Sequence, residues 1–141
     1  MAYLFDTDAL SEVLKPRPAP GYVTWLERIP PEDQFTSAVC VAELYEGACS
    51  SEQRERHLRN IVERVLPALI VLPFDLETAR VFGDLAGGLR RGGQRLADPD
   101  LQIAATAIQH DLELVTGNLR HFARVPRLRV ERILERSRQP R

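Results

Sequence analysis

The stretch LFDTDALSEV, residues 4–13, joins an apolar run to a segment of helical character, and two carboxylates stand at the junction. The apolar residues predict a short buried strand over 2–6, and the residues that follow predict a helix over 8–15. Asp6, Thr7 and Asp8 are all of types that cap helix N-termini, so a strand followed by a capped helix explains the stretch without any chemistry. This stretch alone fits both a helix cap and a functional site, and residues elsewhere in the chain are needed to distinguish the two.

The alternation of strand and helix continues along the chain. Short apolar runs predict strands, and apolar residues three or four positions apart predict helices. Strands that alternate with helices imply a parallel sheet, so the predicted fold class is α/β, with three α/β/α layers around about five strands. The further predicted strands are QFTSAV (34–39), ALIVLPFD (68–75), LELVTGN (112–118) and LRVERI (128–133), and the further predicted helices cover 22–29, 38–48, 51–66, 76–91 and 97–111.

Two of these helices carry more detailed expectations. In the helix over 97–111, Asp98 is the predicted N-cap and Pro99 takes the first helical position, which leaves Asp100 in the first turn free for another task. Asp75 is a candidate cap for the helix that follows it. In the helix over 51–66, five apolar residues are expected to face inward, namely Leu58, Ile61, Val62, Val65 and Leu66.

Length and composition limit the class of protein. A chain of 141 residues that is 44% hydrophobic predicts one domain over 1–141 with a core of its own. The net charge of -1 gives no overall basic balance, although eight arginines between 120 and 141 make that end basic. No apolar run approaches the roughly 18 residues of a membrane span, so a soluble, cytoplasmic protein is expected. Cys40 and Cys49 predict two free thiols, without the spacing of a zinc site.

Several polar side chains are predicted at one edge of the sheet. Sites in open parallel sheets form at the carboxyl ends of strands. Asp6 follows the first strand, Asn118 ends the strand over 112–118, and Asp100 begins the helix over 97–111. Glu43 lies beside the apolar stripe of the helix over 38–48. The simpler interpretations are a solvent-exposed Glu43 and an Asp100 that favours its helix dipole.

Convergence of Asp6, Glu43 and Asp100 would place three negative charges in one pocket, which a divalent cation would relieve. Oxygen ligands without Cys or His favour Mg²⁺ or Mn²⁺ over zinc. Such a cation retains open positions for water and for a phosphate oxygen, so the pattern indicates phosphodiester chemistry.

In order and spacing, these motifs resemble the PIN-domain ribonucleases, and most closely the VapC toxins of type II toxin-antitoxin pairs, including the FitB-like branch. The resemblance implies a Mg²⁺- or Mn²⁺-dependent endoribonuclease, an RNA substrate, inhibition by a cognate antitoxin, and a homodimer. By position, Asp6, Glu43 and Asp100 are similar to the family's three acids. The motifs are LFDTDALSEV (4–13), SAVCVAELYEGA (37–48), LPFD (72–75), ADPDLQIAATAIQHDLELVTGN (97–118) and HFARVPRLRV (121–130).

The chain also departs from the family pattern. Asp8 stands where Asn is common, and Asn118 and His121 stand where different members carry a fourth acid. We therefore expect one firmly held metal, bound by Asp6 and Asp100, with Asn118 as a neutral ligand or an amide donor.

The expected mechanism is hydrolysis, in which Glu43 orients or deprotonates the attacking water and arginines hold phosphates without reading sequence. The candidate arginines are those of the C-terminal segment, with Arg90, Arg91 and Arg95. Two alternatives remain open. A catalytically silent PIN scaffold would bind RNA or a partner protein without cutting. A haloacid-dehalogenase-type phosphatase would use Asp6 as nucleophile and Asp8 as acid, but Lys15, the only lysine, is too close in sequence to Asp6 to steady the phosphoryl group.

Overall fold

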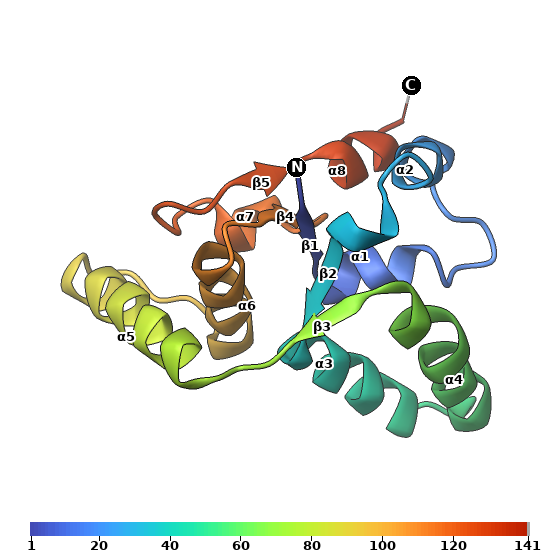
Figure 1. Ribbon diagram of the computed structural model, residues 1–141, viewed down its shortest axis with the longest axis horizontal. Helices are drawn as coiled ribbons and strands as arrows, with labels where there is room; N and C mark the ends of the chain where they lie inside the picture. The colour runs from blue at the N-terminus through green and yellow to red at the C-terminus, as the bar shows by residue number, and fades with distance from the viewer. Residues whose placement is uncertain (141) are drawn as a thin grey trace.

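The computed structural model describes residues 1–140 and shows a five-stranded central sheet (Figure 1). The strand order is β3-β2-β1-β4-β5, and all neighbouring strands are parallel. The predicted parallel α/β fold with about five strands is confirmed. The strands are β1 (Tyr3–Phe5), β2 (Gln34–Ser37), β3 (Ile70–Leu72), β4 (Glu113–Val115) and β5 (Val130–Glu131).

The sheet order reverses between β1 and β4. From β1 the chain builds outward through β2 to β3, and it then returns to the other side of β1 with β4 and β5. Leu4 therefore lies between Phe35 of β2 and Leu114 of β4. In such sheets the crevice at the carboxyl ends of the two strands beside the reversal is where ligands bind. Asp6 and Thr116, which directly follow β1 and β4, are placed at this crevice.

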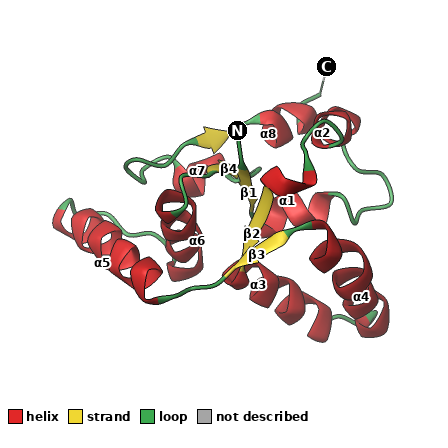
Figure 2. Cartoon of the chain, in the orientation of Figure 1, coloured by secondary structure: helices red, strands yellow, loops and turns green. Residues whose placement is uncertain are grey.

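Helices surround the sheet, with α5 and α6 on one side of the view and α2 and α4 on the other (Figures 1 and 2). Near the C-terminus, α8 packs against α2. No pattern in the sequence had predicted the two short helices α7 and α8. The helices are α1 (Thr7–Glu12), α2 (Pro20–Leu26), α3 (Ala38–Cys49), α4 (Arg54–Asn60), α5 (Leu76–Arg91), α6 (Asp98–Gln109), α7 (Leu119–Phe122) and α8 (Ile133–Arg138).

The helix predicted over 51–66 is not one regular helix. It divides into α4, a wider π-helical turn over Ile61–Val65 and a 3-10 turn over Leu66–Ala68. Ile61 and Val65 are buried as predicted, but the inward placement of Val62 is wrong, because its side chain is 55% exposed. Ile61 and Val65, four residues apart, thus face inward, whereas Val62 faces solvent.

The helix ends were predicted with mixed success. The prediction that Asp98 caps α6 is wrong, because Asp98 is already the first helical residue and Ala97 is the N-cap, with no side-chain hydrogen bond. Asp75 is confirmed as a cap, since it accepts a hydrogen bond from the Thr78 amide, and the Thr78 hydroxyl accepts one from the Asp75 amide. The predicted helix over 8–15 ends earlier, at Glu12.

Two further expectations concern cysteines and membranes. Cys40 is buried and Cys49 exposed, and both are free thiols, as predicted. Over residues 1–140, none of the helices has the length and apolar character needed to traverse a bilayer.

Candidate active site

The carboxylate of Asp6 is buried at the point where the sheet order reverses. The backbone amide of Asp6 donates to the Val115 carbonyl of β4 at 3.1 Å, which fixes the end of β1 against its neighbour. Asp6 is also the N-cap of α1, because its Oδ1 accepts a hydrogen bond from the Ala9 amide at 2.8 Å. Only 4% of the residue is exposed. Capping therefore occupies one lone pair of Asp6 and leaves the rest of the carboxylate for other partners.

The surroundings of Asp6 disfavour its negative charge. Burial raises the pKa of Asp6 to about 7; hydrogen bonds from Thr116 and from the Ala9 amide oppose the shift, and the charges of Asp8 and Asp100 add to it. A buried carboxylate that is repelled by two others gains most from a nearby cation. This environment favours a bound metal ion over a free carboxylate.

Glu43 approaches the site through Thr7, the residue after Asp6. The Thr7 hydroxyl donates to Glu43 Oε1 at 2.6 Å and so joins α1 to α3. Ser37 caps α3 by accepting a hydrogen bond from the Cys40 amide at 3.1 Å, which ties the start of this helix to the end of β2. Because the side chain is half-buried and held by Thr7, Glu43 is not simply a solvated residue on the flank of its helix.

Asp100 lies in the first turn of α6, as predicted. Its Oδ2 is 3.1 Å from His121 Nδ1. Burial raises the pKa of Asp100, while the charge of His121 and its hydrogen bond lower it, and the net shift is upward. The Asp100 charge in turn raises the pKa of Asp6, so these two carboxylates interact. His121 thus lies against Asp100 at a position where some family members carry an acid.

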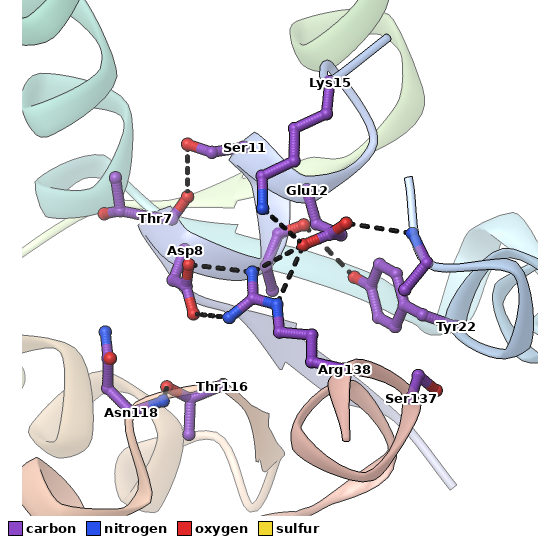
Figure 3. A network of polar contacts seen from close by, with 12 residues as sticks. Thr7, Asp8, Ser11, Glu12, Lys15, Tyr22, Thr116, Asn118, Ser137 and Arg138 are labelled. Carbon is purple, nitrogen blue, oxygen red and sulfur yellow. Dashed lines mark hydrogen bonds and ion pairs between the residues drawn. The ribbon is translucent and has the colours of Figure 1, made fainter. Parts of the chain in front are cut away.

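Asn118 follows β4, at the N-cap position of α7. Its backbone amide donates to the Thr116 hydroxyl at 2.9 Å, and its side chain does not cap α7. The loop places Asn118 beside Thr116, the partner of Asp6, and Figure 3 shows both below Asp8. Sequence reasoning had considered Thr7 only as a possible helix cap. It had not singled out Thr116, because the strand predicted over 112–118 ran past this residue, whereas β4 ends at Val115.

The acids do not form a closed metal cage. Over residues 1–140 there is no group of three or more His, Cys, Asp or Glu side chains arranged to hold a metal ion. Asp6 and Asp100 form one interacting pair, and Glu43 is joined to Asp6 through the adjacent residue. Two carboxylates with neutral oxygens nearby fit Mg²⁺ or Mn²⁺, because these cations keep several waters and need few protein ligands.

Asp8 and Glu12 lie on another side of α1, where Arg138 of α8 engages both (Figure 3). The guanidinium donates to the two Asp8 oxygens at 2.8 and 3.0 Å and twice to Glu12 Oε1, at 2.9 and 2.6 Å. Glu12 also accepts from Lys15 and from the Ala19 amide. The sequence had not indicated this cluster. Asp8 is therefore held by an arginine, which leaves it poorly placed to act as the general acid of a phosphatase.

A cavity of about 740 Å³ has Thr7 and Glu43 in its lining, and Asp6 does not line it. It lies between α1, α3, α4 and the turn after α4. Its lining includes Thr7, Glu43, Lys15, Arg56 and Arg64, so one acid faces three basic residues.

Comparison with known proteins gives consistent matches. Residues 3–128 match the PIN domain family. The ribonuclease VapC2 of Haemophilus influenzae is 35% identical over 136 residues, which cover 93% of this chain and 97% of that protein. The toxin FitB of Neisseria gonorrhoeae is 32% identical, with 84% and 89% covered.

Solved structures agree with these relatives. The crystal structure of FitAcB from Neisseria gonorrhoeae matches with a TM-score of 0.83 and 30% identity, and covers 92% of this chain and 96% of that one. VapBC2 from Rickettsia felis, bound to a DNA fragment from its promoter, matches with a TM-score of 0.83 and 27% identity, and covers 93% and 98%.

Proposed function

The chain belongs to the PIN-domain family, among the VapC ribonucleases, and from this premise we propose that it is a metal-dependent endoribonuclease acting as the toxin of a toxin-antitoxin pair. One observation carries the proposal: Asp6, a buried carboxylate with a pKa raised to about 7, lies where the sheet order reverses and interacts with Asp100. Glu43 is held one residue away through Thr7. Family membership and this arrangement of acids favour the same chemistry.

Asp6 and Asp100 would hold the divalent cation, Mg²⁺ or Mn²⁺. When bound, the cation would offset negative charge on the phosphate and make a water molecule more acidic. The all-oxygen donor set supports these metals, and Asn118 offers a further carbonyl oxygen at the edge of the site.

Glu43 acts as the general base in this proposal. Thr7 engages Oε1, so Oε2 is the oxygen available to take a proton from the water that attacks the phosphorus. The Thr7 hydrogen bond fixes the rotamer of Glu43, which orients that water toward the scissile bond. The amide of Asn118 can donate to a phosphate oxygen. As the new P–O bond forms, the ester P–O bond breaks, and the leaving ribose oxygen takes up a proton from solvent water.

The direct test uses total RNA with Mg²⁺ or with EDTA, and compares the parent with Asp6→Asn and Asp100→Asn. We expect fragments only from the parent with Mg²⁺, and equal folding of all three proteins by circular dichroism. If the two variants cut as fast as the parent, the assignment of these residues is wrong. A parent that binds RNA and never cuts it would favour the catalytically silent scaffold.

We also propose a protein inhibitor, because one matching structure is a toxin-antitoxin complex from Klebsiella pneumoniae and a curated relative is the toxin FitB. Acidic sites attract arginine through charge-assisted hydrogen bonds, so an inhibitor that presents an arginine to Asp6 and Asp100 is expected. Expression of the chain together with the small protein encoded beside it tests this. A stable complex that no longer cuts RNA supports the proposal, and failure to co-purify contradicts it.

The proposal extends to a homodimer acting in the cytoplasm, where RNA is available. β3 is an edge strand, and β3, the following loop and the first residue of α5 expose large apolar side chains, which is typical of a contact surface. Light scattering after gel filtration measures the mass. Leu76→Asp should shift a dimer toward monomer, because Leu76 is 88% exposed. The exposed residues are Ile70, Val71, Phe74 and Leu76.

A further inference from the structure

The arginines of the chain divide into two groups by their partners. Five of them form ion pairs with carboxylates, and these pairs occupy their guanidinium groups. Arg56 has no carboxylate within ion-pair distance among residues 1–140, and the hydrogen bond of Arg64 goes to the Val13 carbonyl, at 3.2 Å. The paired arginines are Arg54, Arg80, Arg127, Arg129 and Arg138.

Arg56 and Arg64 both line the 740 Å³ cavity, which we call the α1–α4 groove and define by Thr7, Lys15, Glu43, Arg56 and Arg64. One end of the groove is the Thr7–Glu43 hydrogen bond, so the groove is continuous with the candidate general base. Among its lining residues, Glu43 is the single acid. Lys15 is paired with Glu12 at 3.0 Å, so Arg56 and Arg64 supply the positive charge that no acid among residues 1–140 neutralises, and His57 lies beside them. The excess of positive charge next to a phosphodiester-cutting site favours an anionic occupant.

The floor of the groove is apolar. Leu44, Ala48 and Ile61 lie at its base, each at most 9% exposed, and Leu14 completes the wall beside Lys15. Cavities of about 300–1,000 Å³ accommodate small organic ligands, and this groove falls within that range. An apolar floor with a basic rim matches a nucleotide, whose base and ribose pack on apolar surface while its phosphate binds cations.

We propose that the α1–α4 groove binds the RNA nucleotides on one side of the scissile phosphate. Arg56 and Arg64 contact phosphate oxygens, and the apolar floor contacts ribose and base. The inference rests on the proposed ribonuclease function. It places substrate binding in the α1–α4 groove and not at the C-terminal arginines. Sequence reasoning favoured the arginines of the C-terminal segment, with Arg90, Arg91 and Arg95. In that segment Arg127, Arg129 and Arg138 are paired with acids, and Arg141 lies outside the described residues. The other candidates form no ion pair among residues 1–140, but none of them lines the groove beside Glu43.

Binding is measured by fluorescence anisotropy of a short single-stranded RNA in the Asp100→Asn background, which prevents cleavage. We compare Arg56→Gln, Arg64→Gln and their double variant. The matched control is Arg59→Gln, because Arg59 is exposed on the same helix and does not line the groove. Thermal unfolding of each variant shows whether the Arg64 change, which removes the bond to Val13, disturbs folding.

The double variant should bind the RNA roughly tenfold more weakly, and the slope of log affinity against log salt should fall by about 0.7 for each arginine removed. Arg59→Gln should leave both quantities unchanged. Equal affinity and equal salt slope in the double variant and its background would overturn the inference, as would an equal loss with Arg59→Gln. Loss of the co-expressed small protein with unchanged RNA affinity would show a protein-binding groove and would also overturn it.

Failure of the groove proposal can be distinguished from failure of the proposed ribonuclease function. With cleavage-competent protein, the same two arginine variants should raise KM and leave kcat within about threefold of the parent. A parent that cuts RNA together with variants of unchanged KM contradicts only the groove. A parent that binds RNA through Arg56 and Arg64 but never cuts it contradicts only the ribonuclease.

Discussion

Two faces of helix α1 carry polar side chains and use them in opposite ways. On one face Asp8 and Glu12, four residues apart, share the guanidinium of Arg138 (Figure 3). On the other face Thr7 and Ser11, also four residues apart, line the open α1–α4 groove, and Thr7 holds Glu43. The first face is closed by an arginine of the same chain, and the second is open to a ligand.

The difference gives a criterion for the arginines of this protein: those paired with carboxylates of the same chain stabilise the fold, and unpaired ones can bind a ligand. Arg138 makes four hydrogen bonds to carboxylates, and one of its partners, Glu12, is 2% exposed, so this arginine is committed to the fold. Arg56 has no such partner in the part of the chain that is described, and it can bind a phosphate. Changes at the α1 face that binds Arg138, which we call the Arg138 face, should therefore alter stability. Changes at the face of Thr7 and Ser11, which we call the Thr7 face, should alter activity.

The largest expected effect is on activity, at Glu43. Glu43→Gln keeps the acceptor for Thr7 but cannot take a proton, so cleavage of a defined RNA should slow by about 10²–10⁴-fold. Single-turnover rates at saturating Mg²⁺ measure this. Glu46→Gln, an exposed glutamate on the same helix, should keep the parent rate. If Glu43→Gln and Glu46→Gln behave alike, the Thr7 face does not carry the chemistry.

The next effect is on stability, at Arg138. Arg138→Met leaves Asp8 and the buried Glu12 without their arginine, while Lys15 and the Ala19 amide still serve Glu12. We expect a loss of about 3 kcal/mol in the free energy of unfolding, measured in urea. The exposed Arg136, changed to Met, is the control and should cost less than about 0.5 kcal/mol. Equal stability of the two variants would contradict the claim that Arg138 stabilises the fold through Asp8 and Glu12.

The pH dependence of stability tests whether the charge of Glu12 stabilises the fold. Burial alone would raise the pKa of Glu12, but hydrogen bonds from the Ala19 amide, Lys15 and Arg138 lower it to about 2, against an ordinary value of 4.5. A lowered folded pKa gives stability that is complete above pH 4.5 and is lost as the pH falls toward 2. The contribution is roughly 2–3 kcal/mol.

Urea unfolding between about pH 6 and pH 3 compares the parent with Glu12→Gln, which cannot titrate. The parent's advantage should shrink as the pH falls, whereas shifts at Asp6 affect both proteins and cancel. A difference that stays constant over this range would show that the Glu12 charge is not what Arg138 stabilises.

The sequence predicts one of these two faces much better than the other. The order of strands and helices and the places of Asp6, Glu43 and Asp100 on them follow from local periodicity and from the rule for parallel sheets. The strand bounds do not, since the structure shortens the strands predicted over 34–39, 68–75, 112–118 and 128–133. Arg138 and Glu12 are 126 positions apart, and their contact depends on the packing of α8 against α2, which no local pattern encodes. The division of the helix predicted over 51–66 into α4, a π-helical turn and a 3-10 turn is likewise not visible in the apolar spacing.

The smallest expected effect is on the free energy of unfolding, at Gly117 in the loop after β4. Gly117 follows Thr116, the partner of Asp6, and a Cβ there would overlap the Arg138 guanidinium and the Asp8 carboxylate. Gly117→Ala should therefore cost about 1–2 kcal/mol in the urea unfolding free energy, because the ion pair has to move. Gly83→Ala, in an open part of α5, should instead be neutral or stabilising by up to about 1 kcal/mol.

A double-mutant cycle identifies the cause of this loss. In the Arg138→Met background most of the cost of Gly117→Ala should disappear, since the crowding guanidinium is gone. If the cost is the same in both backgrounds, backbone conformation and not the Arg138 contact requires glycine at this position. Because the φ angle of Gly117 is not in the positive region, we expect the contact to explain the requirement.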